Sequence, residues 1–252
     1  MNSIAVGLLV SLSIFAGGIG GLYLHRVLPA SHQTRETQDV VRLGIGMISV
    51  LAALVLGLLI ATAKGSYDTT DRAVRTYAAE LALLNETLRD YGNSASVARD
   101  LLRSYTDRLI RDIWPAGDAV PNLNDGDAAQ LLEHVREQVR ALKPIDDGQK
   151  WLRDQALTIN VELLRERWLL IGNQHQSVSP IVLGILASWV TLIFVSFGFN
   201  APRNATVAAA FLICSLSIGG AIFLILEMDR PLTGIMRISY APMRDVIGQM
   251  NW

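Results

Sequence analysis

The sequence predicts an all-α membrane protein with four transmembrane helices and a helical-bundle extramembrane domain between the second and the third. Four apolar runs of about 20 residues each lack any charged residue, and a helix of that length crosses a hydrocarbon core of roughly 30 Å. The charges are concentrated elsewhere, because residues 64–167 hold 15 of the 22 Lys+Arg and 18 of the 23 Asp+Glu. In that charged range apolar residues recur at helical spacing, with no strand-like alternation.

The first apolar run extends from Ile4 to Leu24, and the second from Leu43 to Ala63. The first could instead be a secretory signal. However, it has no basic residues before it and is longer than the apolar part of a typical signal. No small-residue cleavage site follows it closely, since His25, Arg26 and Val27 come next. We therefore expect a retained membrane helix.

Beyond the second run, the apolar positions have the spacing of a helical bundle. They are Val74, Tyr77, Leu81, Leu84, Leu88 and Tyr91. These steps alternate between three and four residues, which is typical of a seam between packed helices. No Pro lies between Arg42 and Tyr91, so the second membrane helix is expected to continue into the domain. Three further helices are expected to begin at residues that can cap them, namely Ser94 or Ser96, Asp127, and Asp146 or Asp147. Together they predict a four-helix bundle.

The third and fourth apolar runs extend from Val178 to Phe199 and from Ala205 to Leu226. Pro202 marks the turn between them, and Asn204 can cap the fourth helix. The predicted organisation has four parts: membrane helices one and two in 1–63, the cytosolic bundle in 64–177, membrane helices three and four in 178–228, and a cytosolic amphipathic tail in 229–252.

The orientation follows from the basic residues near the predicted membrane ends, which are more frequent on the cytosolic side. One side carries Arg26, Arg35, Arg42 and Arg203. The other carries Lys64, Arg72, Arg75, Arg165, Arg167, Arg230, Arg237 and Arg244, together with both termini and the bundle. We therefore expect a multi-pass protein of a bacterial inner membrane whose termini and central domain are cytosolic.

Two membrane helices carry small residues at helical spacing. In the first, Gly17 and Gly21 form a G-x-x-x-G pattern. In the second, one face holds Gly46, Ser49, Ala53, Gly57 and Ala61. Small residues let helix backbones approach closely in lipid, so such a face can pack against another helix. A face of this kind can also line a pore, where small side chains leave room. The five residues of the second helix are the pore-lining candidates.

Charged residues stand at both ends of the last two membrane helices. They are Arg203 in the turn after the third helix and Glu227, Asp229 and Arg230 at the end of the fourth. Acidic side chains at a helix C-terminus are repelled by the negative end of the helix dipole. Arg230 is the nearest positive group that could offset this repulsion. These four residues are either interfacial anchors or part of an ion vestibule.

Enzymatic, metal and nucleic-acid chemistry find little support. His32 with Glu36 and His134 with Glu137 each offer one His and one carboxylate, and a metal site needs three or four ligands. The chain has no phosphate-binding loop, dinucleotide motif or nucleophile elbow. A net charge of −1 provides no basic field for nucleic acid. We expect no enzyme activity, no cofactor and no metal.

Several short segments resemble a bacterial membrane-protein family described as bestrophin-like. They are ETQDVVRLG at 36–44, LVLGLL at 54–59, SYD at 66–68, LRDYG at 88–92, ARDLLR at 98–103, FGFNAPRN at 197–204 and LEMDRP at 226–231. The resemblance covers nearly the whole chain. It implies a pentameric anion channel with four membrane helices and a helical cytosolic domain between the second and third.

The chain departs from animal bestrophins at two points. Animal bestrophins line a narrow neck of the pore with Ile and Phe of the second helix. The second helix of this chain has no aromatic residue, so none of its residues can be assigned to such a neck. The chain also lacks the dense acidic run that forms the calcium clasp of animal bestrophins. The functional hypothesis is an oligomeric ion channel, anion-conducting by resemblance, with lipid, inorganic ions and further copies of itself as partners. The alternative is a non-conducting membrane sensor or scaffold whose bundle binds a ligand or a partner protein.

Overall fold

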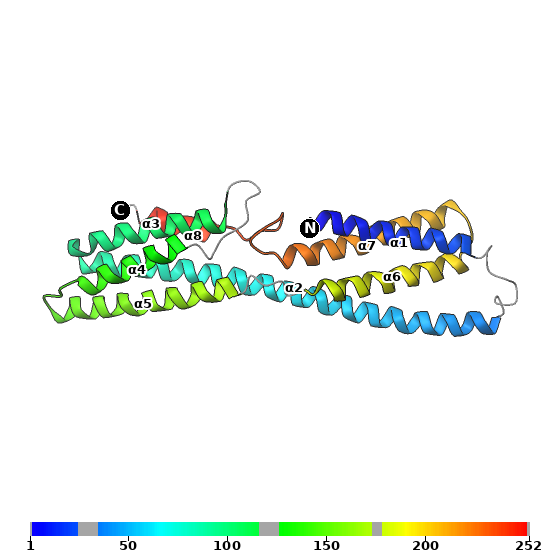
Figure 1. Cartoon of the computed structure of the whole chain (residues 1–252), viewed down its shortest axis with the longest axis horizontal. Coiled ribbons are helices and arrows are strands. Elements are labelled where there is room, and N and C mark those ends of the chain that lie inside the picture. The colour runs from blue at the N-terminus through cyan, green and yellow to red at the C-terminus, as the bar shows by residue number, and fades with distance from the viewer. Residues whose placement is uncertain (1, 25–34, 116–125, 173–177, 251–252) are drawn as a thin grey trace. The chain divides into compact units, whose positions relative to one another are not determined.

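The structure, a computed structural model, describes residues 2–24, 35–115, 126–172 and 178–250, the side chains of residues 35–37 and 249 excepted. Every regular element in these ranges is helical, which confirms the predicted all-α class. The elements are α1 (Ser3–Leu24), α2 (Arg35–Tyr91), the short 3-10 helix η2 (Asn93–Ala95), α3 (Ser96–Ile113), α4 (Gly126–Ala141), α5 (Asp147–Gly172), α6 (Pro180–Asn200), α7 (Ala205–Met228) and α8 (Ala241–Gln249) (Figure 1).

The chain divides into two compact units. Unit 1 comprises Met1–Ser66 and Gln176–Asp229, and unit 2 comprises Tyr67–His175 and Arg230–Trp252. Within the described residues, α1, α2, α6 and α7 are long and apolar enough to cross a membrane. The 57-residue helix α2 contributes to both units, so the expectation that the second membrane helix continues beyond its apolar run is confirmed.

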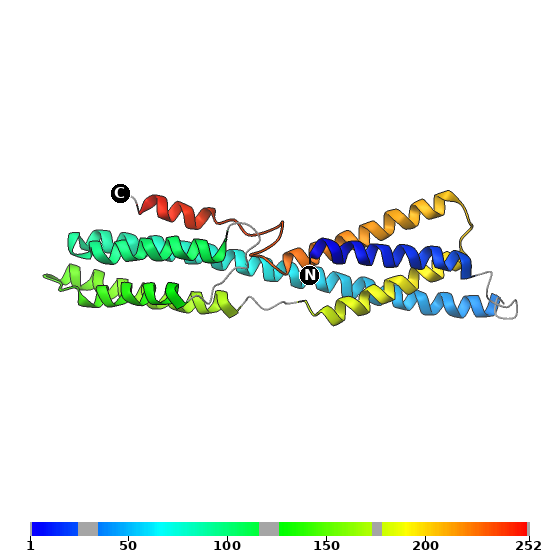
Figure 2. The ribbon, with the colours of Figure 1, turned by 45° about the horizontal axis from the view of Figure 1, so that its top comes forward.

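In unit 1, α1 packs against both α6 and α7 (Figures 1 and 2). Glycines make these contacts close. A Cβ atom added at Gly21 would overlap the Val195 carbonyl oxygen, and one added at Gly198 would overlap that of Gly18. Nearer the start of α1, Gly7 also approaches Gly219 of α7, where an added Cβ atom would lie 2.6 Å from the Gly7 carbonyl oxygen. The packing interpretation of the α1 glycine pattern is therefore correct, as expected where helix backbones approach in lipid.

The ends of the unit 1 helices follow local capping rules. Pro180 occupies the first position of α6, where its missing N–H costs no hydrogen bond. The Asn204 side chain accepts a hydrogen bond of 2.8 Å from the Val207 N–H and so caps α7, as predicted. At their C-terminal ends, α6 extends one residue and α7 two residues beyond the predicted apolar runs, and α6 begins two residues later than its run.

Unit 2 has its own apolar core, and all six predicted seam residues of α2, from Val74 to Tyr91, are buried in it. Helix α3 packs on α4, and α4 on α5. Asp146 caps α5 by accepting from the Gln149 N–H at 2.7 Å. Helix α4 already begins at Gly126, so Asp127 lies in its first turn and pairs with Arg108 of α3 instead of capping it.

The C-terminal residues expected as a separate tail form part of unit 2. Helix α8 packs on α3, and its Met243 and Val246 are buried in the same core as the α2 seam. Just before α8, the carbonyl of Ile238 accepts a hydrogen bond of 2.8 Å from the Trp114 indole N–H. This bond holds the segment to the end of α3.

Candidate functional site

The part of α2 in unit 1 presents three different faces. The first face packs within the chain, where Ala52, Leu59 and Ala63 are buried in the apolar cluster of unit 1. Their side chains are therefore not available to an ion path. The two remaining faces carry the residues that the fold leaves exposed.

The second face is the predicted small-residue face. Gly46, Ala53, Gly57 and Ala61 are exposed and Ser49 is half-buried. A Cβ atom added at Gly46 or Gly57 would meet nothing within 4 Å. The Ser49 hydroxyl donates to the Ile45 carbonyl at 2.8 Å, so its hydrogen is used within the helix. The small-residue patterns of α1 and α2 thus differ in the structure, because only that of α1 is in contact with its own chain.

The third face of α2 carries large aliphatic side chains. They are Leu43, Met47, Val50, Leu54 and Leu58, each 66–72% exposed. At 100° per residue this row lies next to the small-residue face and away from the packed face. Apolar side chains of this kind are suited to contact either lipid or another membrane helix.

Arg203 has a defined structural role. Its Nε–H donates to the Leu22 carbonyl at 3.0 Å, and Leu22 lies in the last turn of α1, whose carbonyls have no partner within the helix. A cation at a helix C-terminus also interacts favourably with the helix dipole. This hydrogen bond supports the interpretation of Arg203 as an interfacial anchor. The Arg203 side chain is otherwise exposed.

Glu227 and Asp229 are both buried at the end of α7. The Asp229 carboxylate accepts a hydrogen bond of 3.1 Å from the Val178 N–H, two residues before α6 begins. The positive, N-terminal end of the α6 dipole therefore stabilises the Asp229 carboxylate. The negative, C-terminal end of the α7 dipole has the opposite effect on the same group. The predicted vestibule residues are thus divided: Arg203 lies at the turn that joins α6 to α7, Glu227 and Asp229 lie at the opposite end of α7, and Arg230 belongs to unit 2.

Unit 2 contains a buried polar layer that the sequence analysis missed. The hydroxyls of Tyr77 on α2 and Tyr105 on α3 are hydrogen-bonded to each other, and both side chains are fully buried. Tyr105 also has a side-chain hydrogen bond with the buried Arg167 of α5. Burial raises the pKa of the Tyr105 hydroxyl, and the hydrogen bonds and the Arg167 charge oppose that rise. The layer joins three helices of the bundle.

Asn160 lies two turns before Arg167 on the same face of α5 and is completely buried. Neither atom of its amide has a hydrogen-bond partner among the described residues. We expect Asn160→Leu, which keeps the branched shape without the polar atoms, to raise the free energy of unfolding by about 1–2 kcal/mol. Thermal unfolding followed by circular dichroism would measure this.

The matched control for that substitution is Asn160→Asp, which has the same shape but adds a charge to a buried position. It should lower stability strongly. If Asn160→Leu instead melts lower than the wild type, the amide has a partner in the folded protein and belongs to a binding site in the bundle.

Only one of the two His–carboxylate pairs lies within the described residues. His134 and Glu137 are both exposed on α4, while His32 and the Glu36 side chain lie outside the described part of the chain. Within the ranges that the structure describes, no three His, Cys, Asp or Glu residues come close enough to hold a metal ion.

Four apolar helices of the described residues are long enough to cross a membrane, and three of them pack through glycine contacts, as is typical of an α-helical membrane protein. The model of the bestrophin-like domain matches residues 12–243, and the chain belongs to the bestrophin-like family. No curated protein and no solved structure shows a significant match to it.

Proposed function

We propose that the chain assembles into a homo-oligomeric ion channel whose path is lined by the small-residue face of α2. The supporting observation is that this face is open at Gly46 and Gly57, whereas Gly17 and Gly21 of the α1 pattern are in contact with α6. From Gly46 to Ala61 the face extends about 22 Å at 1.5 Å per residue. That length covers most of a hydrocarbon core of roughly 30 Å.

The proposed channel needs an oligomer, because the four apolar helices of one chain leave the small-residue face of α2 open and do not enclose a path. In a ring, this face lines the path and the aliphatic face meets an adjacent subunit. Bestrophins suggest five subunits. The distribution of Lys and Arg supports a cytosolic location of unit 2 and of both termini, in a bacterial inner membrane.

The proposal that the conducted ions are anions rests on the family relationship. The small-residue face of α2 does not itself select for anions. That face has no charged group, and its one hydroxyl hydrogen is bonded to Ile45. The lining therefore offers ions little direct attraction. Any preference for anions is expected to come from charges at the ends of the path, among which Arg203 is exposed.

The alternative function, a non-conducting sensor or scaffold, is favoured by the outer face of α5. Trp151 and Trp168 are 64% and 66% exposed, and Val161 and Leu169 share their side of the helix. Large apolar side chains grouped on a water-facing helix mark an interaction surface. If the protein is a channel, we expect a second copy of the chain to cover this surface. If it is a scaffold, we expect a different protein to bind there. Monomers in lipid nanodiscs that carry no ion current would favour the scaffold.

Cysteine accessibility tests the proposed lining, with the exposed Cys214 of α7 first replaced by Ser. We expect Ala53→Cys and Gly57→Cys to react with charged, water-soluble thiol reagents in the assembled protein, because only a hydrated thiol forms the reactive thiolate. Leu54→Cys on the aliphatic face and Leu59→Cys on the packed face serve as controls and should not react.

The outcomes separate the alternatives. Unreactive cysteines at Ala53 and Gly57 in an oligomer that passes ions would exclude the small-residue face as the lining. A reactive Leu54→Cys together with those unreactive positions would transfer the lining to the aliphatic face and leave the channel itself in place.

A further inference from the structure

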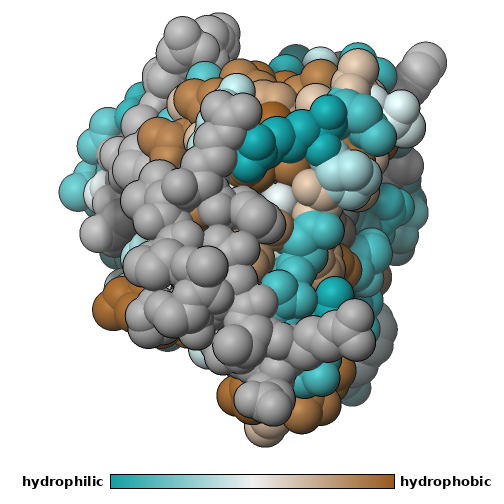
Figure 3. Space-filling model, turned by 90° about the vertical axis from the view of Figure 1, so that its right-hand side faces the viewer, coloured by the Kyte–Doolittle hydropathy of each residue, from teal (hydrophilic) through white to brown (hydrophobic). Residues whose placement is uncertain are grey.

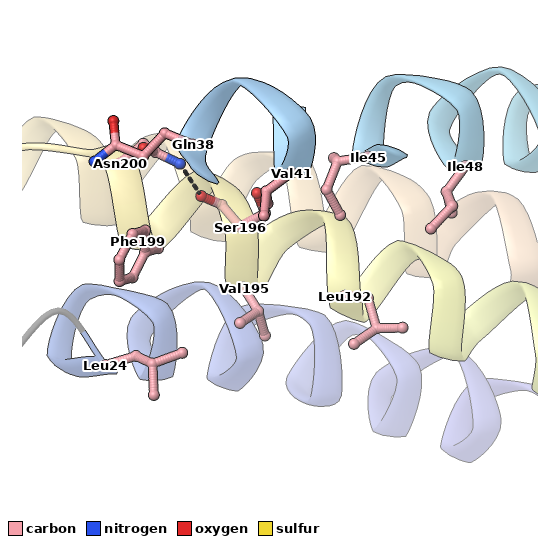
Figure 4. A pocket seen from close by; sticks show the side chains of 10 residues that line it. All are labelled: Leu24, Gln38, Val41, Ile45, Ile48, Leu192, Val195, Ser196, Phe199 and Asn200. Atoms are coloured by element: carbon pink, nitrogen blue, oxygen red, sulfur yellow. Dashed lines mark hydrogen bonds between the residues drawn. The ribbon is translucent and has the colours of Figure 1, made fainter. Parts of the chain in front are cut away.

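Unit 1 contains a pocket of about 300 Å³ between α1, α2 and α6. Its two ends differ in chemistry, as Figure 4 shows. At one end lie the polar side chains of Gln38, Ser196 and Asn200, with Gln38 and Ser196 pointing toward one another. At the other end the wall is aliphatic and includes Ile45, Ile48 and Leu192. The pocket is therefore amphipathic along its length.

The polar end of the pocket coincides with the end of the spanning helices. Gln38 lies in the first turn of α2, and Asn200 is the last residue of α6. From Gln38 to Ile48 the helix rises about 15 Å, which is half of a hydrocarbon core of roughly 30 Å. The polar residues thus stand at the depth of the lipid headgroups, and the aliphatic wall continues toward the middle of the bilayer.

A basic residue stands near the polar end. Arg203 is bonded through Nε to the carbonyl of Leu22, two residues before Leu24, which lines the pocket. The guanidinium has two further NH₂ groups that can donate to phosphate oxygens. Seen from this end of the molecule, hydrophilic and hydrophobic residues lie next to one another on the coloured part of the near face (Figure 3).

We propose that this pocket binds one phospholipid of the surrounding leaflet. An acyl chain lies along Ile45, Ile48 and Leu192, and the headgroup phosphate lies at the polar end within reach of Arg203. A phospholipid is the occupant that fits, because the pocket opens among membrane-spanning helices and its chemistry changes at the same depth as that of a lipid molecule. The site holds whether or not the protein conducts ions.

The test measures phospholipid retained by the full-length protein after purification in mild detergent, by native mass spectrometry and phosphate analysis. We expect the wild type to retain phospholipid and Ile48→Trp, which fills the deep end, to lose it. Val50→Trp is the matched control: it adds the same ring to the exposed aliphatic face of α2 and should retain lipid. Leu192→Trp fills the pocket from α6 and replaces Ile48→Trp should that variant fail to fold.

The headgroup arm compares phosphatidylglycerol with phosphatidylethanolamine in mixed vesicles. One well-placed Arg near a membrane surface is expected to favour the anionic lipid about fivefold, and Arg203→Gln should remove that preference. A wild type that carries no phospholipid after purification would overturn the proposal. Equal retention in Ile48→Trp, Leu192→Trp and Val50→Trp would overturn it as well, because the lipid would then be a general coat rather than the occupant of this pocket.

Discussion

Replacing Gly198 by Val should destabilise unit 1 more than any other single change proposed for it. A Cβ atom at Gly198 would overlap the Gly18 carbonyl oxygen and approach the Leu22 nitrogen to 3.0 Å. Backbone atoms cannot rotate out of the way as a side chain can, so α1 and α6 must separate. Overpacking of this kind costs about 3 kcal/mol, and here the separation also loses the contacts along the rest of the crossing.

The measurement is the temperature at which the protein leaves the folded peak in size-exclusion chromatography after heating in detergent. Gly20→Val is the matched control, because it changes the same residue type in α1 at a position where a Cβ atom meets nothing within 4 Å. Gly198→Ala should fall between the two. Equal melting temperatures for Gly198→Val and Gly20→Val would show that the close approach of α1 and α6 is not formed.

This contrast also shows where sequence reasoning succeeds and where it stops. The apolar spans, the α2 seam and the Asn204 cap follow from local rules, because each depends on hydration, helical spacing or a single capping bond. The glycine patterns of α1 and α2 look alike in the sequence. Which of them packs within the chain depends on where α6 and α7 lie, and composition does not encode that placement.

The polar layer of unit 2 was missed for a different reason. On α5, Arg167 stands four residues after Leu163 and three before Leu170, which is the spacing of a seam between packed helices. A charged residue in register with a seam is the signal that could have predicted a buried Arg167. Its partners Tyr77 and Tyr105 could not have been assigned, because each belongs equally well to an apolar seam.

The second large effect is expected from Gly57→Trp, which should abolish ion flux while leaving the protein folded and assembled. A side chain at position 57 enters open space within the chain, so nothing in unit 1 resists it. If the small-residue face lines the path, the indole occupies the lumen and the apolar constriction excludes water and ions. Chloride efflux from proteoliposomes would measure the block, and mass measurement in nanodiscs would measure assembly.

The control for Gly57→Trp is Leu59→Trp, two residues further on the packed face. Leu59 is buried in the apolar cluster of unit 1, so extra volume there should lower the melting temperature whether or not α2 lines a path. A Gly57→Trp protein that melts like the wild type and blocks flux supports the lining. If subunit number or melting temperature changes first, the small-residue face is a contact between subunits. The conduction path must then lie along the aliphatic face from Leu43 to Leu58, or the protein works as a scaffold without one.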